Sequence, residues 1–193
     1  MKKILQSIFA SIAVFAFSIQ ITNAAIKTSI ANGNWNTAAT WSPSGVPAAT
    51  DIVIINTNVV LDKNISIDPG GSLTINLGKS LIGSGFNINF NGSTTGGLQV
   101  FILNNGTITC STLTESTECA DSRIDNYGII NVTASLGTTA VLNWRSSDTL
   151  YNHTGATLNV LAGLFRSSNQ SWTTCNGGNG KPTTVNEGTM NVY

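Results

Sequence analysis

Charged side chains occupy every second position in the segment Asp121-Ser122-Arg123-Ile124-Asp125. Along an extended strand, successive side chains point to opposite faces, so the two carboxylates and the guanidinium share one face and Ile124 lies on the other. Enzymes that cleave polysaccharides use carboxylates as catalytic groups, and an arginine beside them could hold an acidic polysaccharide. Because no second carboxylate cluster accompanies this one, a surface ion pair explains the same residues more simply.

The chain has one histidine, His153. A Ser-His-Asp triad needs a histidine beside a nucleophile, and a multi-histidine metal site needs several of them. His153 instead lies in an Asn-His-Thr-Gly turn, at a position where related segments have Tyr127 and Glu187. The sequence therefore predicts a solvent-facing turn residue, with no catalytic residues, no metal site and no cofactor.

Aromatic rings offer the remaining chemistry, because a tryptophan can stack on a sugar ring. Trp172 lies in the polar loop 167–174 and is the tryptophan that we expect to be exposed, so it is the candidate ligand-binding residue. Trp35 and Trp41 are expected to cover one end of the core, and Trp144 to pack in the core or a cap.

The first residues predict export. A positive segment at residues 1–3 precedes an apolar, uncharged run at 4–21, and residues 22–24 place small side chains at the two positions that a signal peptidase reads. We expect cleavage before Ala25 and a mature protein that is secreted or held at the cell surface. A membrane anchor is the alternative, because the apolar run approaches spanning length. Polar residues within the run and the small-residue exit favour cleavage.

Three cysteines remain in the mature chain, and an odd number in an exported protein allows one bridge and one further thiol. Cys110 and Cys119 flank the polar stretch 111–118, so we expect a disulfide between them that closes this stretch as a loop. Three unpaired thiols are the alternative, and the state of Cys175 is left open.

Composition narrows the class of protein. Removing 24 of the 193 residues leaves 169, enough for one domain with a sizeable core. Two of the nine basic residues leave with the signal peptide, so seven basic and nine acidic side chains give a formal charge of −2. Nucleic acids and anionic membranes both call for a basic patch, so we expect neither as a partner, and no membrane span after cleavage. Charged residues are scarce and Asn, Thr, Ser and Gly are abundant, which favours sheet over helix.

Short β-type runs follow one another from Asp51 onward, broken by Gly, Asn, Asp and Pro. The first four runs are 52–55, 59–61, 65–67 and 73–77. Residues 26–44 look like a loop instead. No window carries a sustained helical period with caps, so we expect almost no helix in the mature chain.

A weak internal repeat occupies the second half of the chain. Each copy reads apolar, Asn, a short gap, Gly and then alternating apolar residues; the copies are 103–108, 124–132, 150–160 and 185–192. Their glycines, at 106, 128, 155 and 188, are spaced by 22, 27 and 33 residues, as regular turns with variable loops between them would be.

This repeat favours a solenoid. Asn suits a sharp corner, Gly removes the steric penalty beside it, and the alternating residues send every second side chain into a core. We therefore predict a right-handed parallel β-helix at residues 58–193, after a cap segment at 25–57. Stacked corners would align Asn side chains between coils. An antiparallel β-sandwich is the alternative, because it fits the strand lengths too.

The segment Gly33-Asn34-Trp35, with Thr40-Trp41-Ser42, Pro47 and the runs 51–54, 59–61 and 71–75, resembles the amino-terminal region of large secreted surface proteins of the Bacteroidetes. It is also distantly similar to the extracellular β-rich domain family named for its eight glycines. The Asn-x-Gly repeats resemble the β-helical body of the same surface proteins. This resemblance implies a structural or adhesive function and supplies no catalytic residues.

We therefore expect a structural or adhesive module of an exported bacterial surface protein, not an enzyme. A carbohydrate-binding or polysaccharide-cleaving β-helix is the alternative. The expected partners are surface glycans or other surface proteins. The final repeat closes at Tyr193, so we also expect either a longer β-helix or association with a partner, including a second copy, through the C-terminal edge.

Overall fold

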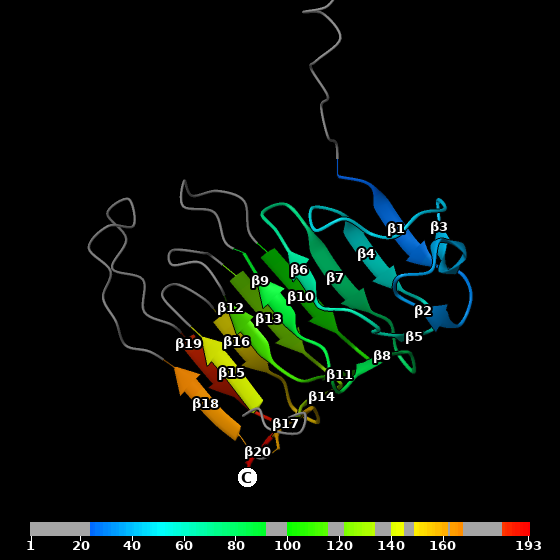
Figure 1. Cartoon of the computed structure of the whole chain (residues 1–193). Helices are drawn as coiled ribbons and strands as arrows, with labels where there is room; N and C mark the ends of the chain where they lie inside the picture. The colour runs from blue at the N-terminus through cyan, green and yellow to red at the C-terminus, as the bar shows by residue number, and fades with distance from the viewer. Residues whose placement is uncertain are drawn as a thin grey trace, which may run out of the picture.

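Three β-sheets built mainly from parallel strands stack into a β-solenoid, in which the chain visits each sheet in turn (Figure 1). The computed structural model describes residues 24–91, 100–115, 122–133, 140–144, 149–161, 163–167 and 183–193. These residues contain no α-helix; the one helical turn is η1 (Ala38–Thr40), a 3-10 turn. No helix in this part of the chain is long and apolar enough to cross a membrane.

Sheet A has eight strands, in spatial order β3 (Trp41–Ser42), β1 (Ile26–Ser29), β4 (Ile52–Ile55), β7 (Ser72–Ile75), β10 (Val100–Asn104), β13 (Ser122–Asn126), β16 (Thr149–Asn152) and β19 (Thr183–Asn186). Sheet B has seven: β2 (Gly33–Asn34), β5 (Asn58–Val60), β8 (Ser80–Gly83), β11 (Thr107–Cys110), β14 (Ile129–Val132), β17 (Thr157–Val160) and β20 (Thr189–Val192). Sheet C has five: β6 (Ile65–Ile67), β9 (Ile88–Phe90), β12 (Leu113–Glu115), β15 (Ala140–Trp144) and β18 (Gly163–Ser167).

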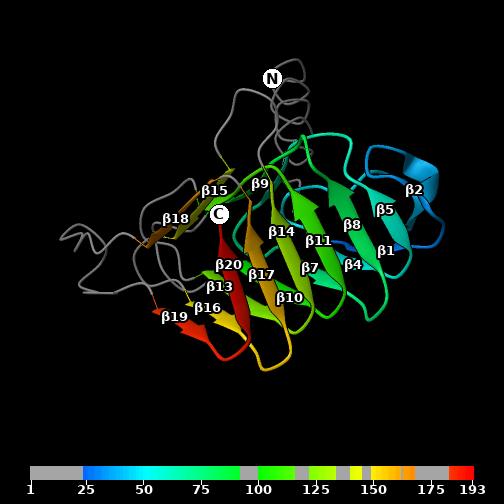
Figure 2. The same cartoon turned by 90° about the horizontal axis from the view of Figure 1, so that it is seen from below.

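The pairing confirms the predicted parallel solenoid and rules out the sandwich of antiparallel hairpins. Every strand pair among the described residues is parallel except β1 with β3. Figure 2 shows the strands of sheet B side by side in chain order, from β5 to β20. Because neighbours in each sheet come from successive coils, each coil contacts mainly the coil before it and the coil after it.

The core lies between the three sheets and consists of one inward row after another. In sheet A, Leu73, Ile102 and Ile124 are paired in register and almost fully buried. Sheet B contributes equivalent rows, such as Ile108 beside Ile130. Each such side chain stabilises the fold by about 1.5–3 kcal/mol, and alternation along every strand is what makes these rows continuous.

The N-terminal end of this core is closed by two tryptophans. Trp35 and Trp41 are buried, with ring centroids 5.0 Å apart and an edge-to-face angle of 71°. The indole Nε1 of Trp41 donates a hydrogen bond of 2.9 Å to the carbonyl of Trp35. The expectation that these two residues cover the end of the core is confirmed.

The prediction of a loop at residues 26–44 was wrong, because β1 is a parallel strand beside β4. Its sequence, Ile-Lys-Thr-Ser, lacks inward apolar residues, so no alternation marked it as a strand. Ser29 is fully buried, and its hydroxyl accepts hydrogen bonds from the backbone N–H groups of Asn56 and Thr57. A buried hydroxyl that accepts hydrogen bonds from the next coil takes the place that an apolar side chain occupies in later coils.

Candidate functional site

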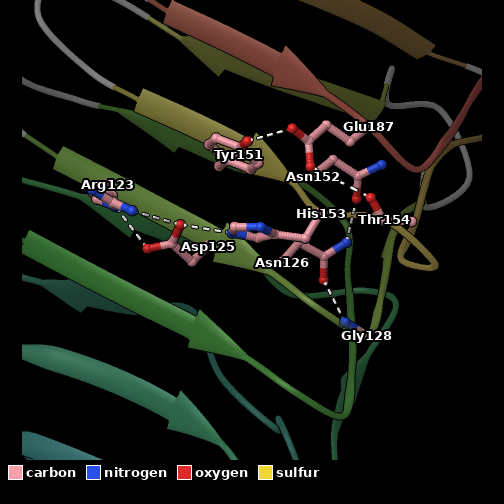
Figure 3. Close-up of polar contacts among 9 residues, drawn as sticks. All are labelled: Arg123, Asp125, Asn126, Gly128, Tyr151, Asn152, His153, Thr154 and Glu187. Atoms are coloured by element: carbon pink, nitrogen blue, oxygen red, sulfur yellow. Dashed lines mark hydrogen bonds and ion pairs between the residues drawn. The ribbon is translucent and has the colours of Figure 1, made fainter.

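The ionisable groups that lie together on the outer face of sheet A form the candidate site. This Asp125 cluster consists of Arg123, Asp125, Tyr127, Tyr151, His153 and Glu187, most of which are drawn in Figure 3. It takes side chains from β13, from β16 and from the corners that follow β13, β16 and β19. It therefore spans three successive coils.

A row of asparagines, three of them buried and the last one exposed, positions these corners. Nδ2 of Asn104 donates to Oδ1 of Asn126, Asn126 donates to Asn152, and Asn152 donates to Asn186, each at 2.7 Å. The same amide of Asn126 accepts the backbone N–H of Gly128 at 3.2 Å, which holds the chain as it leaves sheet A. This Asn ladder confirms the predicted alignment of Asn side chains between coils.

The residue after each ladder asparagine shares a second row, which contains Tyr127, His153 and Glu187. The backbone N–H of His153 donates to the carbonyl of Asn126, and that of Glu187 donates to the carbonyl of Asn152. The prediction that these three positions are equivalent is confirmed. The row brings a phenol, an imidazole and a carboxylate from segments far apart in sequence to one edge of the sheet.

One predicted equivalence was wrong. The register pairs Ile129 with Thr157, so the residue that matches Gly128 is Ala156 and not Gly155. Gly155 is part of a two-residue insertion and has a φ of 84°, in the left-handed region that favours glycine. The insertion makes this corner longer than the others, and His153 is the first residue of the longer turn.

Position 128 has no room for a side chain, so it must be a glycine. It is not among the glycines with positive φ, but a Cβ at this position would lie 2.1 Å from the carbonyl oxygen of Gly106. Glycine is therefore needed here for the space between the coils and not for a left-handed backbone conformation. The two coils approach each other so closely at this corner that only a hydrogen fits.

The Asp125 carboxylate is the centre of the cluster. Its Oδ2 accepts a hydrogen bond from Nε of Arg123 at 2.6 Å, and its Oδ1 accepts one from Nη2 at 2.9 Å. The side chain of Asp125 is 6% exposed, whereas that of Arg123 is 50% exposed. The predicted ion pair is confirmed, although its acidic partner lies out of solvent.

The electrostatics fix both members of this pair in their charged forms. Burial raises the pKa of the Asp125 carboxyl, but the hydrogen bonds from Arg123 and His153 outweigh it and hold the pKa below its usual range. The hydrogen bond to Asp125 raises the pKa of the Arg123 guanidinium above its already high ordinary value.

His153 was predicted to face solvent, and this prediction was wrong. Its side chain is 19% exposed, and Nε2 lies 3.0 Å from Oδ1 of Asp125. Since a carboxylate only accepts hydrogen bonds, Nε2 carries a proton. The ring stacks on Tyr127 at 3.8 Å and on Tyr151 at 4.0 Å between centroids. Two rings stacked on the same face would overlap each other, so the tyrosines cover opposite faces of the imidazole.

Tyr151 continues the cluster to the next coil. Its hydroxyl donates a hydrogen bond of 2.6 Å to Oε1 of Glu187. This bond raises the pKa of the Tyr151 phenol. Oε2 of the same carboxylate lies 3.4 Å from the hydroxyl of Thr154, in the inserted turn.

These contacts link three successive coils to one another. General acid–base catalysis works best when the pKa of the catalytic group lies near the working pH. The pKa of Asp125 is lowered and those of Arg123 and Tyr151 are raised, so all three are shifted away from that range. Both faces of His153 are occupied, so this ring cannot stack on a sugar. Among the described residues, no three His, Cys, Asp or Glu side chains are grouped to hold a metal ion.

The residues predicted to bind a ligand or form a disulfide lie elsewhere. Trp172, Cys119, Cys175 and Asp121 fall outside the described residues. Cys110 lies at an inward position of β11 and has no disulfide partner among the described residues; burial raises the pKa of its thiol to about 12. The disulfide between Cys110 and Cys119 stays a prediction.

Two members of the cluster were missed by reasoning from the sequence. Tyr127 was noted only as an equivalent of His153, and Tyr151 was not singled out. The signal that could have identified Tyr151 is its place in the register of sheet A. Tyr151 pairs with Asp125, and both residues face outward on adjacent coils. Finding it requires the coil register, which depends on the lengths of the insertions.

Comparison of the chain with protein-family models, with curated proteins and with solved structures finds no match in any of the three.

Proposed function

We propose that this chain is a structural or adhesive module of an exported bacterial surface protein, with uncharged surface glycans as its counterpart. The observation that carries the proposal is the outer amide ladder of sheet B. Nδ2 of Asn191 donates to Oδ1 of Asn159 at 2.8 Å, Asn159 donates to Asn131 at 2.8 Å, and Asn131 donates to the hydroxyl of Thr109 at 3.2 Å.

This outer ladder supports adhesion for a chemical reason. Its side chains are half-buried and uncharged, and each amide keeps hydrogen-bonding capacity beyond the bonds within the ladder. Regularly spaced amides, about 4.8 Å apart along the sheet, can meet the hydroxyl groups of a neutral glycan without desolvating a charge.

The absence of a reaction centre is part of the same proposal. Support comes from the Asp125 cluster, whose ionisable groups are paired with each other across three coils. The likeness of the Gly33–Ser42 region to secreted surface proteins, together with the signal segment at residues 1–24, supports export.

The experiment that tests the proposal is a glycan array probed with the purified mature protein, residues 25–193. We expect binding to neutral glycans that is weakened at least tenfold in the double variant Asn131→Thr, Asn159→Thr, which keeps strand propensity but removes two amides. Asn89→Thr, in sheet C, is the matched control and should bind normally. Binding that is unchanged in the double variant would contradict the assignment of this face.

The polysaccharide-cleaving alternative is tested in parallel. Mature protein is incubated with acidic polysaccharides and calcium, and release of reducing ends is measured. We expect none. Cleavage that is lost in Asp125→Asn would overturn the proposal and make the Asp125 cluster an active site.

A further inference from the structure

Asp51 is a buried carboxylate without a cationic partner. It lies immediately before β4 and is 6% exposed. Oδ1 accepts the backbone N–H of Ala25 at 2.9 Å, and Oδ2 accepts the backbone N–H of Ala48 at 2.8 Å. Both ion pairs found among the described residues involve Asp125, so Asp51 has none there.

A positive charge would stabilise this carboxylate beyond what its two neutral donors provide, because a buried charge is best compensated by an opposite charge that is hydrogen-bonded to it. The lysine on the neighbouring strand β1 does not supply it. Lys27 donates from Nζ to the carbonyls of Pro43 at 3.0 Å and Ser44 at 3.2 Å.

The residue that reaches Asp51 is the one that signal cleavage would place at the amino terminus. In the precursor, the nitrogen of Ala25 belongs to a neutral amide. Hydrolysis adds water across the bond between Ala24 and Ala25: the carbonyl carbon of Ala24 leaves as a carboxylate, and the nitrogen of Ala25 takes up a proton and becomes an ammonium. The group 2.9 Å from Oδ1 then carries a full positive charge.

We propose that Asp51 is a socket for the α-ammonium group of mature Ala25, and that cleavage of the signal peptide stabilises the first coil by forming this ion pair. The inference rests on the proposed cleavage before Ala25. Its chemistry is local, since a charge-assisted hydrogen bond replaces a neutral one at the same two atoms.

The ion pair would lie where the first coil is hydrogen-bonded to the coils that follow it. The carbonyl of Ala25 accepts the N–H of Ile52 at 2.9 Å, which is the first bond between β1 and β4. The carbonyl of Asp51 accepts the N–H of Ser72 at 3.1 Å, which ties the next coil to the same point. A precursor with a neutral amide here has a weaker first coil, which suits a chain that must cross a membrane before it folds.

Four proteins test the proposal. One is residues 25–193 with a free Ala25 amine, released from a fusion by a protease that leaves no extra residue. The second has Gly-Ser before Ala25, which keeps the amide hydrogen bond and moves the charge away. The other two carry Asp51→Asn in each background. Urea unfolding is followed by fluorescence, with Trp35 and Trp41 reporting on the first coil.

We expect the free amine to raise the folding equilibrium constant roughly 5- to 10-fold over the Gly-Ser protein, because hydrogen bonds to charged groups are stronger than neutral ones. Asp51→Asn should remove this difference. Equal stabilities of the two proteins that keep Asp51, or a difference that persists between the two Asp51→Asn proteins, would overturn the proposal.

A second readout does not depend on the folding of the Asp51→Asn variants. The rate at which an activated ester acylates the free Ala25 amine near neutral pH should be at least fivefold slower in folded protein than in urea, because an ammonium held by a carboxylate is less often deprotonated. Equal rates would contradict the socket. N-terminal sequencing of exported protein separates the two hypotheses: a terminus other than Ala25 refutes the cleavage site, whereas Ala25 with equal stabilities refutes the socket alone.

Discussion

The corner between sheets A and B is filled by apolar side chains in early coils and by amides in later ones. The pairing register places Ile55, Ile75, Asn104, Asn126 and Asn152 in one inward row, and all five are fully buried. An isoleucine gains from leaving water whatever lies beside it, whereas an asparagine gains only if the next coil presents the matching atom. The amides of the later corners therefore favour one register of the coils over others, whereas the earlier corners are stabilised by apolar packing in any register that buries them.

The largest effect is expected where the later coils approach most closely. Gly128→Val should destabilise the protein by about 4 kcal/mol or more, because a side chain must displace the carbonyl of Gly106. Urea unfolding measures the change. Gly70→Ala is the control for a glycine with a φ of 87° and open space around it, and it should cost only about 1 kcal/mol. A well-folded Gly128→Val protein with the stability of the parent would contradict the close approach.

The next effect distinguishes the two kinds of corner directly. Ile55→Asn should cost about 3–4 kcal/mol, because its neighbours in the row, Ser29 and Ile75, extend no amide to it. Ile75→Asn should cost about 1–2 kcal/mol less, because its new amide can donate to Oδ1 of Asn104 and lengthen the ladder by one rung. Equal losses in the two variants would show that the ladder contributes no directional stabilisation.

A smaller loss is expected from an interruption of the ladder. Asn126→Ala should cost about 2–3 kcal/mol, since it leaves an amide donor of Asn104, an acceptor of Asn152 and the N–H of Gly128 without partners. Asn186→Ala, at an exposed rung, should cost less than about 1 kcal/mol. Comparable losses at both positions would mean that burial does not set the strength of the ladder.

The smallest effect concerns pH. The folded-state pKa of Asp125 is lowered, so its contribution to stability is present above its unfolded pKa of about 3.9 and is lost as pH falls through the folded pKa. We expect this loss, about 1 kcal/mol, to occur below pH 4 and to be absent in Asp125→Asn. Urea midpoints of both proteins between pH 7 and pH 2.5 measure it. Parallel pH profiles would contradict the pKa shift.

Much of this fold was predictable because its signals are local. The Asn-x-Gly corners and the alternating strands after them identified the solenoid, since both follow from contacts within one coil. The strand β1 was missed because its buried position holds Ser29. The hydroxyl of Ser29 accepts hydrogen bonds from backbone N–H groups that lie 27 and 28 residues away in the chain. Gly155 was aligned in place of Ala156 because a two-residue insertion cannot be seen from composition.

The candidate site was only partly predictable for the same reason. Arg123 and Asp125 are two residues apart on one strand, so alternation sufficed to pair them. The stacking of His153 between Tyr127 and Tyr151 depends on which residues of different coils share a row. That register is set by loops of variable length, whose effect appears only when the coils are stacked.

The two amide ladders run in opposite directions along the solenoid. In the Asn ladder between sheets A and B, each Nδ2 donates toward the later coil, from Asn104 to Asn126 and onward. In the outer ladder of sheet B each donates toward the earlier coil, from Asn191 back to Asn159. Their side-chain dipoles therefore oppose each other, unlike the peptide dipoles of an α-helix, which add up to partial charges at its ends. Extra rungs in both ladders would strengthen the stack without building an axial field, so electrostatics from these amides set no limit on the number of coils.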